Sequence, residues 1–162
     1  MEQYASELLA LCDEQLFTHG GCHVFAFALR EEIRPYPLLR VREKGGDHDH
    51  VACAPDPEDE RLLDVFGWLS HDEYKREEML ERRQLSFLLI QEEEVKKRFT
   101  LTRGQGYYAH PDFFCPATER ARAWIAKYRE YFDGTQKVAI PGLHRVKKAS
   151  GEDIDAIFQE PA

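Results

Sequence analysis

The sequence has no hydrophobic run long enough to cross a membrane. A membrane-spanning helix needs about 20 consecutive apolar residues, and charged side chains interrupt this chain well before that length is reached. The first segment, "MEQYASELLALCDEQLF", carries acids where a signal peptide needs bases, so it is expected to form an amphipathic helix. The sequence therefore predicts a cytoplasmic protein that does not bind membranes.

Basic residues are in the minority, and cysteines are few. The chain has 22 Lys and Arg against 30 Asp and Glu, a net charge of −8. An acidic surface repels phosphate backbones, so nucleic acid is not expected as a partner. The four cysteines form no CxxC pair, and in a reducing compartment they are expected to be free thiols. Cys12, Cys53 and Cys115 lie in apolar patterns and are predicted to belong to the core.

The pattern of the remaining residues predicts one α+β domain over residues 1–162. With 162 residues and 43% hydrophobic side chains, the chain can bury a real core. We expect a central helix packed on a small antiparallel sheet, with further helices outside. Residues 85–90 ("LSFLLI") fit either a strand or a continuing helix. The other expected elements are helices at 2–17, 24–33, 71–84 and 116–132, a three-stranded meander at 38–42, 50–54 and 62–68, a short strand at 137–140 and a last turn from Ser150.

The stretch "GGCHVFAFAL", residues 20–29, places a cysteine between two glycines and an apolar run. A helix that is apolar nearly all round belongs inside a domain, so Cys22 would be held firmly at its tip. The glycines allow a sharp turn into the helix and leave the sulfur approachable. A thiol at a helix N-terminus beside an imidazolium has a lowered pKa and can act as a nucleophile. His23 is expected to be structural or to lie at the rim of the site.

Two further side chains would complete a catalytic set with Cys22. His50 opens the "HVACA" strand and is the preferred base; His48 would face the same side and is the alternative. Asp64 stands within the apolar strand "LLDVFG", where a carboxylate is costly to bury without a partner. A turn at "PDPEDER" would bring positions 64 and 50 together, so that Asp64 could orient the imidazole.

This arrangement resembles the papain-like superfamily, in particular the transglutaminase-like proteins, the arylamine acetyltransferases and the NlpC/P60 hydrolases. The resemblance rests on "GGCHVFAFAL", "HDHV" and "LLDVFG", and covers about residues 15–68. It implies that Cys22 is the nucleophile, His50 the base and Asp64 the residue that orients it. Papain has a glutamine before its cysteine as an oxyanion donor, and Gln15 is the candidate here; the backbone N–H of Cys22 could supply another donor.

The expected activity is an attack of the thiol on an amide or ester through an acyl-enzyme, with no cofactor. The substrate would be a protein, a peptide or a small amide, released by hydrolysis, deamidation or transfer. Aromatic side chains that could form a substrate wall are Tyr107, Tyr108 and Trp68.

Two other interpretations remain open at this point. His48, His50 and Cys53, with Cys22 or Asp64, could bind zinc, although position 53 of a strand faces away from position 50. The domain could also be an inert papain-like binding module, such as an inhibitor, an immunity protein or a decoy.

Overall fold

The fold is α+β, with one curled antiparallel sheet and helices on both of its faces. The computed structural model describes residues 2–101 and 111–143. In chain order the main elements are α1 (Glu2–Leu9), α2 (Asp13–His19), α3 (Cys22–Glu32), β1 (Leu38–Glu43), β2 (Asp49–Cys53), β3 (Arg61–Asp64), β4 (Gly67–Ser70), α4 (His71–Glu77), β5 (Leu85–Ile90), α5 (Glu92–Leu101) and α6 (Pro111–Lys127).

The sheet has the strand order β4-β3-β2-β1-β5, and every neighbouring pair is antiparallel. The ambiguous segment at 85–90 is therefore a strand, β5. The prediction of a single strand over residues 62–68 was wrong, because the chain reverses there and forms the β3–β4 hairpin. Gly67 has φ 89° at this turn, and a Cβ on it would lie 2.9 Å from the carbonyl oxygen of Val138. Only glycine accepts both the left-handed backbone and the close approach.

The first predicted helix is two helices, because a distant side chain binds the end of the first. Arg120, on α6, donates hydrogen bonds to the carbonyl oxygens of Leu9 and Leu11 and forms an ion pair with Asp13. Those carbonyl groups would otherwise need partners within a continuing helix. The sequence pattern of residues 2–17 contains no sign of this contact.

Other helix boundaries also differ from the prediction, including the end of α6, which lies at Lys127 and not at 132. The N-terminus of α4 has the expected capping box, in which Ser70 Oγ accepts the Glu73 N–H at 3.0 Å. The helix nevertheless ends at Glu77 instead of residue 84, and Met79 then adopts a left-handed φ of 58°. Helix α6 begins at Pro111 and not at 116, since a proline fits the first turn of a helix. The short strand expected at 137–140 is a single bridge between Ala139 and Gly67, and the turn from Ser150 lies outside the described residues.

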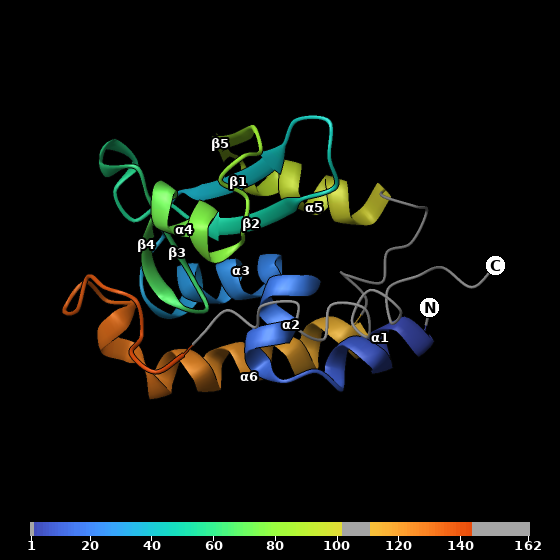
Figure 1. The fold of residues 1–162 in the computed structure, drawn as a ribbon. Coiled ribbons are helices and arrows are strands. Elements are labelled where there is room, and N and C mark those ends of the chain that lie inside the picture. The colour runs from blue at the N-terminus through green and yellow to red at the C-terminus, as the bar shows by residue number, and fades with distance from the viewer. Residues whose placement is uncertain (1, 102–110, 144–162) are drawn as a thin grey trace.

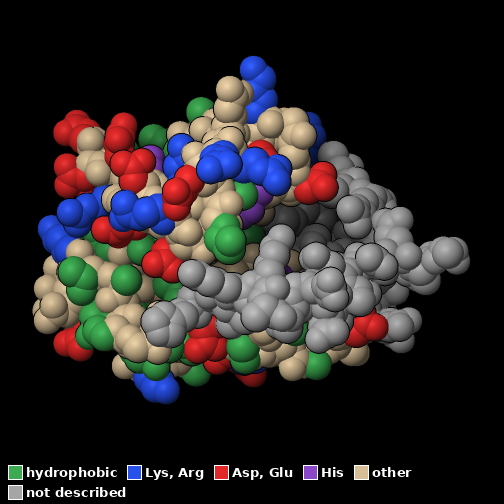
Figure 2. Space-filling view, viewed as in Figure 1, with side chains coloured by type: hydrophobic (Ala, Val, Ile, Leu, Met, Phe, Trp, Pro, Cys, Tyr) green, Lys and Arg blue, Asp and Glu red, His purple; other side chains and the backbone are tan. Residues whose placement is uncertain are grey.

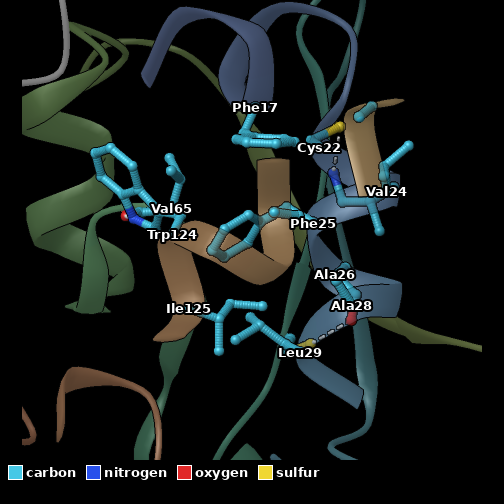
Figure 3. Close-up of a cluster of buried hydrophobic side chains, with 14 of the residues drawn as sticks. Phe17, Cys22, Val24, Phe25, Ala26, Ala28, Leu29, Val65, Trp124 and Ile125 are labelled. Atoms are coloured by element: carbon cyan, nitrogen blue, oxygen red, sulfur yellow. Dashed lines mark hydrogen bonds between the residues drawn. The ribbon is translucent and has the colours of Figure 1, made fainter. Parts of the chain in front are cut away.

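Helix α3 lies between the sheet and α6, and so forms the middle layer of the molecule (Figure 1). The larger core cluster gathers around it, with Phe25 near the centre and Phe17 and Cys22 at one end (Figure 3). A second cluster on the other face of the sheet includes Tyr74 of α4. Cys53 is fully buried as predicted, but Cys12 and Cys115 are exposed, so their assignment to the core was wrong.

The exterior carries charges of both signs. On the face seen in Figure 2, acidic and basic side chains are intermixed over the half that contains the sheet and α4, and no broad patch of one sign covers it. Within residues 2–101 and 111–143, no helix combines the length and apolar character needed to cross a bilayer.

Candidate active site

Cys22 is the first residue of α3, the helix at the centre of the core. Gly21 precedes it as the N-cap, with φ −104°, so this glycine is not needed for a left-handed backbone. It is needed for space: a Cβ on Gly21 would lie 3.0 Å from the Leu16 carbonyl oxygen and 3.3 Å from the Phe17 ring. Gly21 thus lets α2 pack directly against the start of α3, which fixes the position of the sulfur.

The Cys22 sulfur lies beside β2, on the side of that strand that faces β3. The Val51 N–H donates a hydrogen bond to Sγ at 3.4 Å. That N–H is available because β2 and β3 are paired only at Cys53 and Leu63, and then diverge. Cys22 is 8% exposed, and the Phe17 ring lies beside it (Figure 3). The thiol is therefore in a largely dry environment.

His50 and Asp64 are in direct contact, with His50 Nε2 3.1 Å from Asp64 Oδ2. The pairing of Cys53 with Leu63 places Asp64 diagonally across from His50. Both side chains are buried, at 2% and 3% exposure. Because Asp64 occupies Nε2, Nδ1 is the ring nitrogen of His50 left to face Cys22, and the two side chains shift each other's pKa.

The turn that carries Asp64 is held at two points. Its other carboxylate oxygen, Oδ1, accepts the Phe66 N–H at 3.0 Å. The indole N–H of Trp124, on α6, donates to the Val65 carbonyl oxygen at 2.9 Å. A buried carboxylate needs such partners, because an unpaired charge in the interior is very costly. The β3–β4 turn thus presents Asp64 to His50 in one orientation.

The electrostatics of the pair favour a thiolate and an imidazolium. Burial alone raises the pKa of Cys22, but hydrogen bonds from His23 and His50 and the positive charge of these rings outweigh it and lower the pKa to about 6. For His50, burial opposes the charged form, but the hydrogen bonds to Asp64 and Cys22 dominate and raise the pKa to about 10. Both shifts favour the thiolate–imidazolium pair over the neutral pair.

His23 is the member of this group that the sequence pattern did not indicate. It is 3% exposed, follows Cys22 on α3, and its ring helps to lower the pKa of the Cys22 thiol. Its ring also meets the edge of the Phe27 ring, with centroids 6.4 Å apart. Neighbouring residues on a helix point in different directions, so sequence adjacency gave no reason to expect this contact.

His48, the alternative base, contacts Tyr74. Its Nε2 lies 2.6 Å from the Tyr74 hydroxyl. The Tyr74 ring in turn stacks on His50, with centroids 5.6 Å apart and planes 19° from parallel. The two histidines do lie on one side of the chain, as expected of alternate positions, but of the two only His50 lowers the Cys22 pKa. Tyr74 therefore supports the His50 ring on the side of α4.

The other predicted residues lie away from this contact network. Gln15 is on α2, and the hydrogen bonds of the described residues include none from its side chain. Trp68 lies on β4 and lines a surface cavity of about 470 Å³ with Arg61 and Lys137, whose cationic groups are 6.0 and 5.6 Å from its ring centroid. Cys22, His50 and Asp64 do not line that cavity. The two proposed wall tyrosines, Tyr107 and Tyr108, lie outside the described residues.

The residues considered for zinc are not gathered into a ligand set. The Cys53 thiol donates to the Ala26 carbonyl oxygen at 3.5 Å on the α3 side of the sheet, and burial raises its pKa to about 12. Zinc binds the thiolate, which this environment disfavours. Among the described residues, no three His, Cys, Asp or Glu side chains are grouped as metal ligands would be.

No protein-family model, curated protein or solved structure that was compared with the chain matches it. Membership of the papain-like superfamily thus stays a prediction from the residues alone. The site itself contains a thiol of low pKa at a helix N-terminus, an imidazole that contacts it, and a carboxylate that contacts the imidazole.

Proposed function

We propose that this protein is a thiol-dependent hydrolase or acyl transferase that acts on an amide or ester. Cys22 is the nucleophile, His50 exchanges the proton, and Asp64 orients the imidazole. The observation that carries the proposal is geometric: the Cys22 sulfur lies 3.4 Å from the Val51 backbone nitrogen, next to His50 on β2, and His50 Nε2 lies 3.1 Å from Asp64 Oδ2. The lowered pKa of Cys22 and the raised pKa of His50 support it, because enzymes tune such values by burial and specific neighbours.

The reaction follows from the protonation states of the pair. The Cys22 thiolate attacks the carbonyl carbon and forms a C–S bond, and the carbonyl oxygen becomes an oxyanion. The N–H of Cys22 at the start of α3 is a candidate donor to that oxygen, since the first N–H groups of a helix have no partner within it. The C–N or C–O bond then breaks, and the imidazolium gives its proton to the leaving amine or alcohol.

The acyl group leaves Cys22 in a second step. Water or an amine attacks the thioester carbonyl while neutral His50 accepts its proton, and the C–S bond breaks to regenerate the thiolate. Water as acceptor gives hydrolysis or deamidation, and an amine gives transfer. A protein, a peptide or a small amide can each supply the acyl group, as the papain-like resemblance implies.

An activated ester tests the proposal without knowledge of the natural substrate. With p-nitrophenyl acetate, we expect a burst of nitrophenolate and an acetyl group on Cys22, located by peptide mass spectrometry. Cys22→Ser should abolish the burst, while Cys12→Ser, which removes an exposed thiol away from the site, should leave it unchanged.

A third variant separates general base function from folding. His50→Asn should remove the burst while circular dichroism shows the same secondary structure. The proposal fails if Cys12 or Cys115 acquires the acetyl group as fast as Cys22 does, or if His50→Asn, still folded, keeps the burst.

A further inference from the structure

The strand β5 forms one edge of the sheet and has few features that protect an edge. The sheet ends at β5, beyond β1. Its sequence, "LSFLLI", contains no proline and no charged residue. Leu88 and Leu89 are each 56% exposed, which is unusual for large apolar side chains on a strand. Natural proteins usually blunt such edges with charge, proline or a bulge, because an open edge pairs with other strands.

The register of β5 shows which of its backbone groups face outward. The Lys44 N–H donates to the Gln84 carbonyl oxygen, so this pair is hydrogen-bonded. Hydrogen-bonded pairs alternate along an antiparallel ladder, so Ser86, Leu88 and Ile90 bond β1 in the same way. The N–H and C=O groups of the three intervening residues point away from β1, and within the described part of the chain they have no hydrogen-bond partner. These residues are Leu85, Phe87 and Leu89.

The charges at the two ends of β5 are opposite. Arg82 precedes the strand, and Glu93 and Glu94 follow it. The neighbouring Arg83 is already ion-paired with Glu43, and Glu92 with Arg30 and Lys96. In an antiparallel pair of β5 strands, the basic end of each copy lies beside the acidic end of the other. A parallel pair would instead place like charges together. The segment is thus complementary to itself in the antiparallel orientation, as a two-fold interface requires.

We propose that β5 is the interface of a homodimer, in which two copies pair antiparallel through this edge and form one continuous ten-stranded sheet. The pairing satisfies the outward N–H and C=O groups of β5 and partly covers Leu88 and Leu89, one on each face of the sheet. It is independent of the proposed chemistry, because β1 separates β5 from the strand that carries His50. The end charges set the orientation, and the strand itself supplies most of the affinity.

Sedimentation equilibrium of the full chain tests the association. We expect a concentration-dependent dimer that Leu89→Lys weakens about tenfold or more. Val138→Lys is the matched control, since Val138 is similarly exposed (53%) but lies at the opposite edge beside β4. Arg82→Glu should weaken the dimer a few-fold at low salt, and adding Glu93→Arg should restore it. Neither side chain forms an ion pair among the described residues.

Amide hydrogen exchange identifies the edge that pairs. In the dimer, the amides of Leu85, Phe87 and Leu89 should become protected, whereas those of Ser86, Leu88 and Ile90 should be protected at every concentration. A chain that stays monomeric at all concentrations overturns the proposal. So does a dimer in which the three outward amides still exchange fast, because its interface would then lie elsewhere.

Discussion

The pH dependence of Cys22 alkylation is the sharpest prediction of the site. With a pKa of about 6, Cys22 is about half thiolate at pH 6. A free thiol of ordinary pKa, about 8.5, is only about 0.3% thiolate there. A thiolate of lower pKa is also less nucleophilic, by about 10- to 18-fold for this difference of about 2.5 units. The net expectation is that Cys22 reacts about tenfold faster than the free thiol at pH 6.

At pH 9 the order should reverse. Both thiols are then mostly ionised, so only the lower nucleophilicity of Cys22 remains, and it should react about tenfold more slowly. Cys22 is only 8% exposed, so limited access lowers its alkylation rate, but by a similar factor at both pH values. The ratio of the two rates should therefore change by about 100-fold between pH 6 and pH 9, whatever the access.

The assay is competition for limiting iodoacetamide between the protein and N-acetylcysteine, with Cys22 modification measured by peptide mass spectrometry. Thiolate absorbance in the ultraviolet, taken as wild type minus Cys22→Ser, gives the titration without any need for reagent access. A Cys22 rate that rises with pH in parallel with N-acetylcysteine would refute the reasoning, because the hydrogen bonds from the two histidines would not be favouring the thiolate.

Three further predictions address the parts that hold the site. Asp64→Asn removes the negative charge beside the His50 imidazolium, so the pKa of His50 should fall. The thiolate then loses its positive partner, and the pKa of Cys22 should rise by about 1–3 units in the same absorbance titration. An unchanged titration would contradict the role given to the carboxylate. Trp124→Phe leaves the buried Val65 carbonyl oxygen without its hydrogen-bond donor, so urea unfolding should show a free energy of unfolding lower by about 1–3 kcal/mol. An unchanged free energy of unfolding would mean that this hydrogen bond does not hold the β3–β4 turn. Cys53 is fully buried and has a raised pKa, so it should react with iodoacetamide only when the protein unfolds. Its labelling rate should therefore increase with urea concentration. Rapid labelling of the native protein would contradict its position in the core.

Much of the fold could be predicted from local patterns. The apolar run after Cys22 indicated a buried helix, and alternating and β-branched segments indicated strands β1 and β2. The capping box at Ser70 marked the start of α4. These signals depend on periodicity and on side chains within a few residues of each other, which is the information that a sequence displays directly.

The errors in the sequence-based prediction arise where contacts between residues far apart in the chain determine the local structure. Arg120 divides the first helix by binding carbonyl groups more than a hundred positions away in the chain. The exposure of Cys12 and Cys115 likewise depends on how whole helices pack, and not on the apolar pattern around each thiol. The reversal at Gly67 is fixed by the approach of the segment at Val138. None of these contacts leaves a local trace.

The sequence by itself determined which residues could do chemistry: a cysteine at the head of an apolar helix, a histidine that opens a strand, and an acid within another strand. Only the tertiary structure shows that His50 contacts Asp64 while His48 contacts Tyr74, that His23 lowers the Cys22 pKa, and that Gln15 lies outside these contacts. The physical reason is that a pKa and a proton transfer depend on distances of a few ångströms between atoms from separate elements. Those distances are set by the divergence of β2 from β3 and by the packing of α3 beneath them.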